Sequence, residues 1–509
     1  MFDYLEERDL ERCDWQNDFP LITCGTGSGK TDFVMSRKLA NHIERETGKE
    51  IDFTLLLVPT RTLKQDVLSN YKDAVPLDYR DLMQPTESEN IRVACFAQIV
   101  QFLLDGNEIT NVPDLIVLDE MDCLVSWTLA FKGYASAFDW ILSKRNEMFV
   151  CGLTATPALL LDYMDDVGFS FRNITPNYPI KHKTEAIEVV SHSSVSTYLK
   201  TMRVDENNKA LVYIRSARRC RELKDRFGER AGFIVSTSNE NYEKQSFSCS
   251  AFGDRNKKDL RDYLIEENKL PPHIDLLFIN DSMNAGFNIN DKKVKTVIAE
   301  SVDLSIGIQV KGRIRNALQK FVFIYNNKER ESFRERLDVA REFFDQEPNQ
   351  DFLKGFFLQE GNEKEGLLLV YRCGNRYKVN PFAKPLLEYE FSIYRDIDRE
   401  GYFKPLAAHS DNEISFINGS ESLRNIGKVV NLDLRSLFGF REDETEKHVA
   451  AKELTEIAKS VELRDAKGNI LGKDTFCNLV NERTGFSISS LGRKQIKGKR
   501  ATYYLVKSG

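Results

Sequence analysis

One short stretch of the sequence combines residue types that are suited to binding phosphate. In "LITCGTGSGKT", from Leu21 to Thr31, three glycines are followed directly by lysine and threonine. Such a loop lets backbone N–H groups turn inward around phosphate oxygens at the positive end of a helix. The stretch predicts a nucleoside-triphosphate site in which Lys30 reaches the outer phosphates and Thr31 holds Mg²⁺. The expected loop comprises Gly25, Thr26, Gly27, Ser28, Gly29, Lys30 and Thr31.

A second cluster, "VLDEMD", supplies the carboxylates that such a site needs. Asp119 ends an apolar run, where it can hold Mg²⁺ through water, and Glu120 is placed to orient or deprotonate an attacking water. Alone, the cluster is also compatible with an ordinary acidic junction between a strand and a loop. Its position downstream of a phosphate loop favours the catalytic interpretation.

The elements that must position these residues are short buried strands. Apolar runs alternate with glycine or polar turns and helical stretches, which is the pattern of βαβ units in a parallel sheet. The chemically able residues follow the runs directly, and ligands of open α/β sheets bind at the carboxyl ends of the strands. The runs include 53–59, 114–120, 148–157, 210–216, 275–281 and 296–301.

Six motifs occur in order over residues 20 to 316: "CGTGSGKT" (24–31), "VPTRTLKQ" (58–65), "DEMD" (119–122), "LTATP" (153–157), "MNAGFNIN" (283–290) and "QVKGRIRN" (309–316). Together they resemble the motif series of superfamily 2 helicases and translocases. The first motif of that family is A-x-x-G-x-G-K-T, so Cys24 stands at an alanine position. The last motif ends closer to the origin-binding helicases of herpesviruses and their mobile-element relatives than to DEAD-box RNA helicases.

The resemblance implies ATP and Mg²⁺ bound between two RecA-like domains. It assigns catalysis to Lys30, Asp119, Glu120, Gln309, Arg313 and Arg315, nucleotide contacts also to Gly286 and Asn288, and the metal to Thr31 and Asp119. The second arginine of the last motif lies one place early, at Arg315, so either Arg313 or Arg315 is the arginine finger. The family's upstream adenine-reading glutamine has one candidate, Gln16, but the segment before the phosphate loop is short.

The resemblance also implies a nucleic-acid track across both domains, opposite the ATP cleft. Backbone contacts on such a track give affinity without sequence choice. Residues 215–226 are compatible both with a part of this track and with a helix face that only contacts solvent. The expected track residues are Pro59, Thr60, Arg61, Thr154 and Thr156 in the first domain and Ser216, Arg218, Arg219 and Ser282 in the second, and Thr154 and Thr156 are also expected to relay the state of the nucleotide.

Size and composition set the outer limits. A chain of 509 residues is too long to fold around a single hydrophobic core, so we expect two to four domains. A content of 41% hydrophobic and 29% charged residues is typical of a soluble globular protein. The absence of a long apolar run and of an apolar leader predicts a cytoplasmic protein of a prokaryotic or virus-infected cell with no membrane partner. Nine scattered cysteines indicate reduced thiols. We expect RecA-like domains over 1–175 and 185–330, an accessory region with a hairpin over 331–440, and a final domain over 441–509.

The pattern of the last domain, residues 441–509, predicts a winged helix. Helical spacing over 448–461, a helix capped by Asp474, a short helix at 487–494 and a basic hairpin over 493–506 give the order helix, helix, helix, hairpin. The last 24 residues carry six cations and no acid. An oligomerisation module or a basic tail is the alternative. The expected DNA contacts are Arg493, Lys494, Lys497, Lys499 and Arg500, aided by the paired aromatics Tyr503 and Tyr504.

These observations predict an ATP-dependent DNA helicase or translocase that acts in replication, repair, mobile-element maintenance or defence, with further proteins of those processes as partners. Two alternatives stay open. One is an RNA helicase. The other is an ATP-gated nucleic-acid-binding switch with little turnover, which the early position of Arg315 favours because a misaligned finger impairs hydrolysis more than binding.

Overall fold

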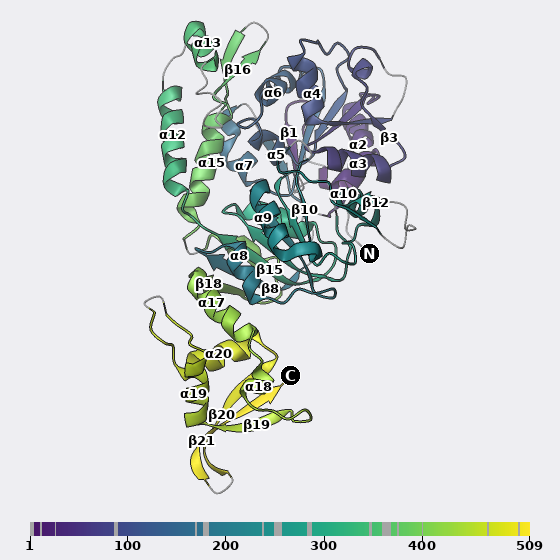
Figure 1. Cartoon of the computed structure of the whole chain (residues 1–509). Helices are drawn as coiled ribbons and strands as arrows, with labels where there is room; N and C mark the ends of the chain where they lie inside the picture. Colours follow the sequence, from purple (N-terminus) through teal and green to yellow (C-terminus); the bar gives the residue numbers. More distant parts are fainter. Residues whose placement is uncertain are drawn as a thin grey trace.

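The computed structural model describes residues 5–10, 13–25, 27–85, 90–167, 171–176, 183–236, 239–248, 257–281, 288–345, 349–358, 368–373, 376–399, 401–465, 468–496 and 499–508. Its upper part holds two parallel sheets with their helices, and a smaller domain extends below them (Figure 1). In the described part of the chain, every helix is too short or too polar to cross a lipid bilayer.

The first sheet has seven parallel strands in the order β3-β4-β2-β5-β6-β1-β7. All five residues of β2 are buried, because helices cover both faces. The strands are β1 (Phe19–Thr23), β2 (Thr54–Val58), β3 (Ala74–Pro76), β4 (Ile91–Cys95), β5 (Leu115–Leu118), β6 (Phe149–Thr154) and β7 (Phe171–Ile174). The helices are α1 (Lys30–Met35), α2 (Lys38–Thr47), α3 (Arg61–Asn70), α4 (Phe96–Leu104), α5 (Met121–Ser126), α6 (Tyr134–Ser143) and α7 (Ala158–Tyr163).

The second sheet also has seven parallel strands, in the order β10-β13-β9-β14-β15-β8-β18. They are β8 (Thr184–Ser191), β9 (Lys209–Ile214), β10 (Ala231–Ile234), β13 (Leu276–Ile279), β14 (Val294–Glu300), β15 (Leu318–Tyr325) and β18 (Ile414–Asn418). Its helices are α8 (Val195–Tyr198), α9 (Ala217–Phe227), α10 (Leu260–Glu267) and α11 (Leu304–Gly312), and a small ribbon joins β11 (Ser246–Ser248) to β12 (Lys257–Asp259). The predicted α/β fold class, with two tandem RecA-like domains, is confirmed.

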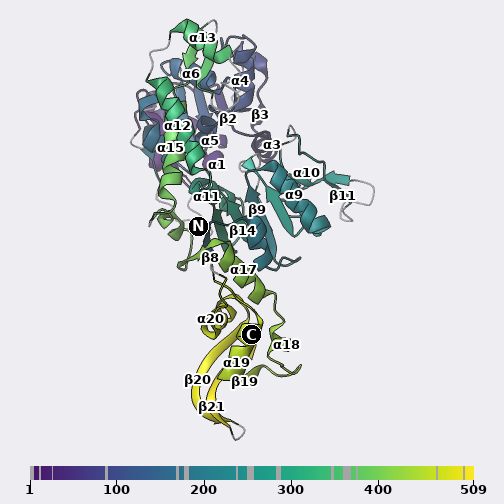
Figure 2. The same ribbon diagram turned by 60° about the vertical axis from the view of Figure 1, so that its left-hand side comes forward.

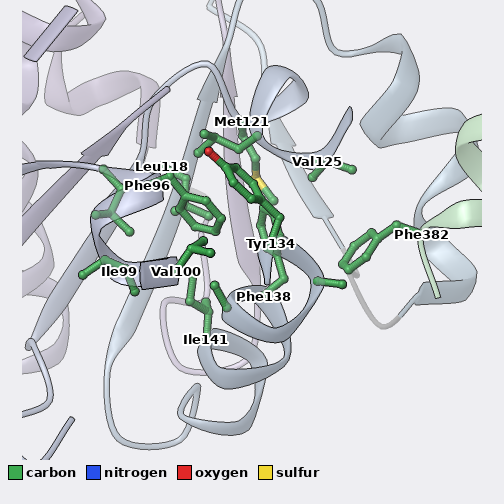
Figure 3. Close-up of a cluster of buried hydrophobic side chains, with 14 of the residues drawn as sticks. Phe96, Ile99, Val100, Leu118, Met121, Val125, Tyr134, Phe138, Ile141 and Phe382 are labelled. Carbon is green, nitrogen blue, oxygen red and sulfur yellow. The ribbon is translucent and has the colours of Figure 1, made fainter. Parts of the chain in front are cut away.

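The region between the second sheet and the last domain is divided between its neighbours. The segment α12 (Arg330–Phe344), α13 (Gln350–Leu358), β16 (Val370–Cys373), β17 (Arg376–Val379) and α15 (Ala383–Asp396) packs on the first domain, with β16 and β17 as an antiparallel hairpin. Phe382 reaches into the cluster around Phe138 (Figure 3). The chain then returns through α16 (Lys404–Ala407) to add β18 beside β8. Residues 331–440, which the sequence predicts to be an accessory region with a hairpin, therefore contact both parallel-sheet domains.

The last domain begins with α17 (Gly419–Val430) and α18 (Leu434–Leu437). It continues with β19 (Glu446–Ala450), α19 (Ala451–Ser460), α20 (Lys473–Arg483), β20 (Phe486–Ile496) and β21 (Lys499–Ser508), and its antiparallel sheet has the order β19-β21-β20. The long hairpin of β20 and β21 curves away from the body of the molecule (Figure 2).

Three details of the predicted last domain are wrong. Residues 487–494 form no third helix, because Ile488 is buried opposite Val506 and the surrounding serines alternate with apolar residues at the period of a strand. His448 to Ala450 belong to β19, since they pair with β21. The residue before α20 is Gly472, so Asp474 lies inside the first turn and does not cap the helix.

Candidate active site between the two parallel-sheet domains

The phosphate loop connects β1 to α1, at the carboxyl edge of the first sheet. Gly27 and Gly29 have φ of 80° and 84°, the left-handed region that glycine adopts without strain. Lys30 is buried, and its Nζ donates a hydrogen bond to the Cys24 carbonyl at 2.8 Å. Cys24 is buried too, and its sulfur accepts a hydrogen bond from Ser28 Oγ at 2.9 Å. The cysteine therefore fills a core position without disturbing the loop. Thr26 lies outside the described residues.

Asp119 follows β5 and faces the loop. Thr31 Oγ1 donates a hydrogen bond to Asp119 Oδ2 at 3.3 Å. Burial, and then the charge of Glu120, raise the pKa of Asp119 to about 6, although Lys30 counteracts them. A hydroxyl and a carboxylate side by side are hard oxygen donors of the kind that Mg²⁺ accepts together with waters and phosphate oxygens. The pair therefore fits the predicted metal.

Glu120 lies on the boundary between the domains. Its φ of 48° lies in the left-handed region, which is unusual for a residue with a side chain, and Glu120 stands directly before α5. Its Oε1 lies 3.6 Å from Nη2 of Arg313, which comes from the end of α11 in the second domain. Glu120 is 7% exposed and Arg313 6%. Within the described chain, Glu120 Oε2 and Arg313 Nε and Nη2 are buried without a hydrogen-bond partner.

Arg315 reaches the phosphate loop itself. A side chain at position 27 would collide with its guanidinium group. Its Nε donates a hydrogen bond to Asn288 Oδ1 at 2.7 Å, so Asn288 orients the arginine. Burial, and then the charge of Arg313, lower the pKa of Arg315 to about 10. Both arginines therefore face the first domain. Ser282 and Gly286 lie outside the described residues.

A buried hydrogen-bond network crosses the same boundary. Asp122 accepts bonds from the hydroxyls of Thr154 and Thr156, each at 2.6 Å. Gln309 of α11 donates from Nε2 to Asp122 Oδ2 at 3.0 Å and to Thr156 Oγ1 at 2.8 Å. We call Glu120, Asp122, Thr154, Thr156, Gln309, Arg313 and Arg315 together the interdomain seam.

The seam changes two sequence assignments. Thr154 and Thr156 are buried with their hydroxyls engaged by Asp122, so they do not offer groups to a surface track, although they are placed to sense domain closure. Gln309 ties the domains together in this state rather than facing the phosphate loop. Asp122 was not among the predicted site residues, yet it is the centre of the network. The final letter of the D-E-M-D motif was its only signal in the sequence.

Six of the predicted track residues lie near two helix N-termini, Pro59, Thr60 and Arg61 at α3 and Ser216, Arg218 and Arg219 at α9. Pro59 is buried, Thr60 accepts a bond from Leu63 N at 3.1 Å as the cap of α3, and Arg61 is exposed. Ser216 caps α9 in the same way, and its neighbour Arg218 is exposed. Both ends are electropositive and could receive phosphates. Arg219 instead pairs with Glu300 and is held away from such a role.

Gln16 lies away from the phosphate loop. It lines a depression with Trp15, Lys49, Asp114 and Phe149, and Asp114 and Phe149 stand at the amino ends of β5 and β6. The loop occupies the opposite edge of the sheet, so Gln16 does not read the base. The N-terminal segment meets the loop at Leu5, whose backbone N donates a hydrogen bond to the Ser28 carbonyl at 3.2 Å.

The predicted DNA contacts of the last domain lie on the hairpin. Arg493 and Lys494 of β20 and Lys499 and Arg500 of β21 are exposed. Lys497 lies outside the described residues. The two tyrosines are used internally, because Tyr503 is buried and Lys473 Nζ lies over the Tyr504 ring, 4.4 Å from its centroid.

Among known families, the model of the Flavivirus DEAD domain matches residues 16–165. This range contains the phosphate loop, the acidic cluster and Thr154 and Thr156, and is less than a third of the chain. No curated protein matches the chain.

Among solved structures, Mss116p bound to single-stranded RNA and AMP-PNP is 17% identical, with 64% of this chain and 69% of that chain covered and a TM-score of 0.42. Dbp5 of S. cerevisiae bound to RNA and ADP BeF3 is 11% identical, covering 81% and 88% with a TM-score of 0.42. Lhr of Mycobacterium smegmatis bound to single-stranded DNA and AMP-PNP is 12% identical, covering 89% and 66% with a TM-score of 0.41. Likenesses this weak carry no conclusion about this chain. The family match and the site geometry together support an ATP-hydrolysing enzyme of the helicase class.

Proposed function

We propose that the chain is an ATP-dependent DNA helicase or translocase, in which ATP binding closes the interdomain seam and hydrolysis lets it open. One observation carries the proposal. Glu120 and Arg313 face each other from different domains while buried polar atoms of both have no hydrogen-bond partner. Such atoms are costly unless a ligand satisfies them. A phosphate oxygen suits the guanidinium group, and an attacking water suits the carboxylate.

Each residue then has a defined task. Lys30 leaves the Cys24 carbonyl to bind the outer phosphates, and the phosphate loop supplies backbone N–H groups. Thr31 and Asp119 would hold Mg²⁺, which supplies charge neutralisation on the phosphate oxygens. Glu120 orients the water and takes its proton. Arg313 and Arg315 stabilise the charge that develops on the phosphoryl group, with Asn288 orienting Arg315.

Hydrolysis would depend on domain closure, because the arginines and the general base come from different domains. Gln309 and Asp122 make the seam close as a unit, since their hydrogen bonds form only when the domains meet. The N-termini of α3 and α9 would hold successive phosphates of one strand and move relative to each other as the seam opens. This is the coupling that a motor needs.

The placement of Arg315 bears on the alternative of a switch with little turnover. Although Arg315 lies one residue early in the motif, its guanidinium group lies against the phosphate loop. The early position therefore gives no reason to expect impaired hydrolysis. The choice of DNA rests on the basic hairpin of a winged-helix-like last domain. The likeness to origin-binding helicases rests on the Q-x-x-G-R-x-R ending alone.

Steady-state ATPase rates with single-stranded, forked and duplex DNA, and with matching RNA, test the proposal. We expect turnover to rise with DNA and a labelled forked duplex to be unwound or displaced. Lys30→Ala should abolish both activities, whereas Lys49→Ala, an exposed lysine of the same domain, should leave them unchanged. Stimulation by RNA alone would establish the RNA helicase, and tight DNA binding without turnover would establish the switch.

A further inference from the structure

The distal hairpin is the part of β20 and β21 that extends past the end of β19. Strand β19 pairs with β21 only from Tyr503 onward, so Arg493–Ile496 and Lys499–Thr502 form a free two-stranded ribbon. Four residues per strand give it a length of roughly 13 Å before the turn. The ribbon curves away from the rest of the domain (Figure 2).

Cations occupy both faces of this ribbon. Cross-strand partners share a face and neighbouring residues alternate between faces. The register pairs Arg493 with Thr502 and Gln495 with Arg500, which places Arg493 and Arg500 on one face. The same register places Lys494 and Lys499 on the other face. Each face therefore carries one cation from each strand.

These four cations are free to meet an external anion. All four are exposed, and none forms an ion pair with a carboxylate of the described chain, whereas Lys507 at the base of the hairpin pairs with Glu446 at 3.4 Å. Residues 486–508 contain no acidic residue. The Tyr503 hydroxyl lies 3.4 Å from the Ile496 carbonyl and 3.3 Å from the Lys499 carbonyl, which stiffens the ribbon.

The neighbouring helix α20 has the opposite character. Its exposed side chains include Asp474, Asn478 and Glu482, and two of these are acidic. Its two cations are engaged, Lys473 by Tyr504 and Asp474, and Arg483 by the buried Glu188 of the second sheet. A helix whose exposed side chains are acidic or neutral and whose cations are engaged does not attract phosphate, so α20 is poorly suited to lie in a DNA groove.

We propose that the distal hairpin, and not α20, inserts into the major groove of a B-form DNA duplex and contacts the phosphates of both strands. A ribbon lying flat on a duplex would need cations on one face only, but cations on both faces match a groove with phosphates on either side. The B-DNA major groove, about 12 Å wide and about 8.5 Å deep, admits a two-stranded ribbon. The major groove of A-form RNA is too narrow and deep.

The inference rests on the proposed function, because it names the duplex on which that motor would act. It also has consequences of its own. The contacts are to phosphates, so binding is independent of sequence and strongly dependent on salt. The hairpin would hold the duplex while the two RecA-like domains move along one strand.

Fluorescence anisotropy of labelled duplexes with the full-length chain, without ATP, tests the inference. The main variant replaces Arg493, Lys494, Lys499 and Arg500 with glutamine. It should bind duplex DNA at least tenfold more weakly, and the slope of log K against log salt should fall by about 3 to 4. A matched control replaces four exposed cations elsewhere in the same domain, Arg424, Arg441, Lys452 and Lys459, and should change neither value appreciably.

Two further comparisons separate groove insertion from other modes. The double variants Arg493→Gln/Arg500→Gln and Lys494→Gln/Lys499→Gln each remove one face and should each account for about half of the loss in slope. If only one of the two double variants lowered the slope of log K against log salt, insertion of the hairpin into the groove would be overturned. The unmodified chain should bind duplex DNA at least tenfold more tightly than duplex RNA of the same sequence, and equal affinity would overturn the B-form preference.

The ATPase rate on single-stranded DNA keeps this inference distinct from the proposed function. A hairpin variant that keeps stimulated turnover and unaltered duplex affinity refutes the hairpin contact and leaves the motor intact. A chain that binds duplex DNA through the hairpin but hydrolyses no ATP refutes the motor and leaves the hairpin contact intact. Circular dichroism melting should be the same for all variants, since every replaced side chain is exposed.

Discussion

The interdomain seam and the distal hairpin are both built from charged side chains, but their surroundings differ completely. In the seam, Glu120, Asp122 and Arg313 are each at most 9% exposed and come from two domains. In the hairpin, four cations are exposed and belong to one local element. Burial makes each charge in the seam strongly coupled to its partner and sensitive to geometry. Exposure makes hairpin charges additive, screened by salt and tolerant of small movements.

The difference suggests where function is concentrated in this chain. A single substitution in the seam should abolish a step, because each group has one task and one position. Single substitutions in the hairpin should each have a small effect, because phosphate contacts add. The next four predictions are ordered from the largest expected effect to the smallest: two concern the seam, one the joint between the last domain and the second sheet, and one Asp119 beside the seam. The Arg313 test of the central claim comes last.

The largest effect in this series is expected for Glu120→Gln. The amide keeps the shape of the side chain but cannot accept the proton of the attacking water, and a general base contributes about 10²–10⁴ in rate. We expect turnover to fall by that factor while ATP affinity is kept. Glu147→Gln, an exposed carboxylate that pairs with Lys144, is the control. Turnover above a tenth of the original rate would remove Glu120 from the mechanism.

A smaller effect is expected when the Gln309 bridge is removed. Gln309→Ala loses two hydrogen bonds to the buried Asp122 and Thr156, one of them to a charged group, and such bonds contribute about 1.5–3 kcal/mol. DNA-stimulated turnover should fall about 10- to 100-fold. A double-mutant cycle with Thr156→Ala should show a coupling free energy of about 0.5–3 kcal/mol, and strict additivity would contradict a closed seam.

The joint between the last domain and the second sheet should contribute to stability rather than to catalysis. Arg483 pairs with the buried Glu188, which Lys320 also contacts at 3.0 Å. Arg483→Ala should lower the free energy of unfolding by about 1.5–3 kcal/mol, because Lys320 still compensates part of the buried charge. Lys507→Ala, which breaks the exposed pair with Glu446, should cost about 0–1 kcal/mol. Chemical denaturation of both variants compares the buried ion pair between domains with the exposed pair inside the last domain, and equal losses of stability would contradict the difference in burial.

The smallest effect should be the pH dependence that Asp119 confers on nucleotide-free protein. Its pKa is raised from 3.8 to about 6, chiefly by burial, so between those values the native state binds more protons than the unfolded chain. Stability from this group is therefore present at low pH and is lost as pH rises through about 6. Asp119→Asn should raise the melting temperature at pH 7.5 and flatten its dependence on pH from 4 to 6. Unchanged melting at pH 7.5 would contradict the buried charge.

The sequence predicted the elements around the seam well, because the motifs carry both chemistry and structure. Lys30 and Thr31 need a strand before them and a helix after them, and Asp119 needs the end of a buried strand. The structure brings Lys30, Thr31, Asp119, Glu120, Arg313 and Arg315 together. The bonds between Gln309 and Asp122 were not predictable, since no spacing along the chain records which polar groups meet across two domains.

The last domain was predicted less accurately for a different reason. The serine-rich segment 487–494 has weak local preferences, and its strand form depends on pairing with β21. The same holds for β18, a short segment whose place beside β8 depends on the path of the whole accessory region. Charge was the more reliable signal there: the basic residues lie on the hairpin, while the expected aromatic contacts Tyr503 and Tyr504 are used internally.

The central claim is that ATP is cleaved only when an arginine from the second domain reaches the phosphates held by the first. Parallel measurements of ATP affinity and DNA-stimulated turnover in Arg313→Ala test it most directly. We expect turnover to fall by about 10³–10⁵ while the affinity for ATP changes less than tenfold. Turnover close to that of the original chain, with Arg313 removed, would contradict the account.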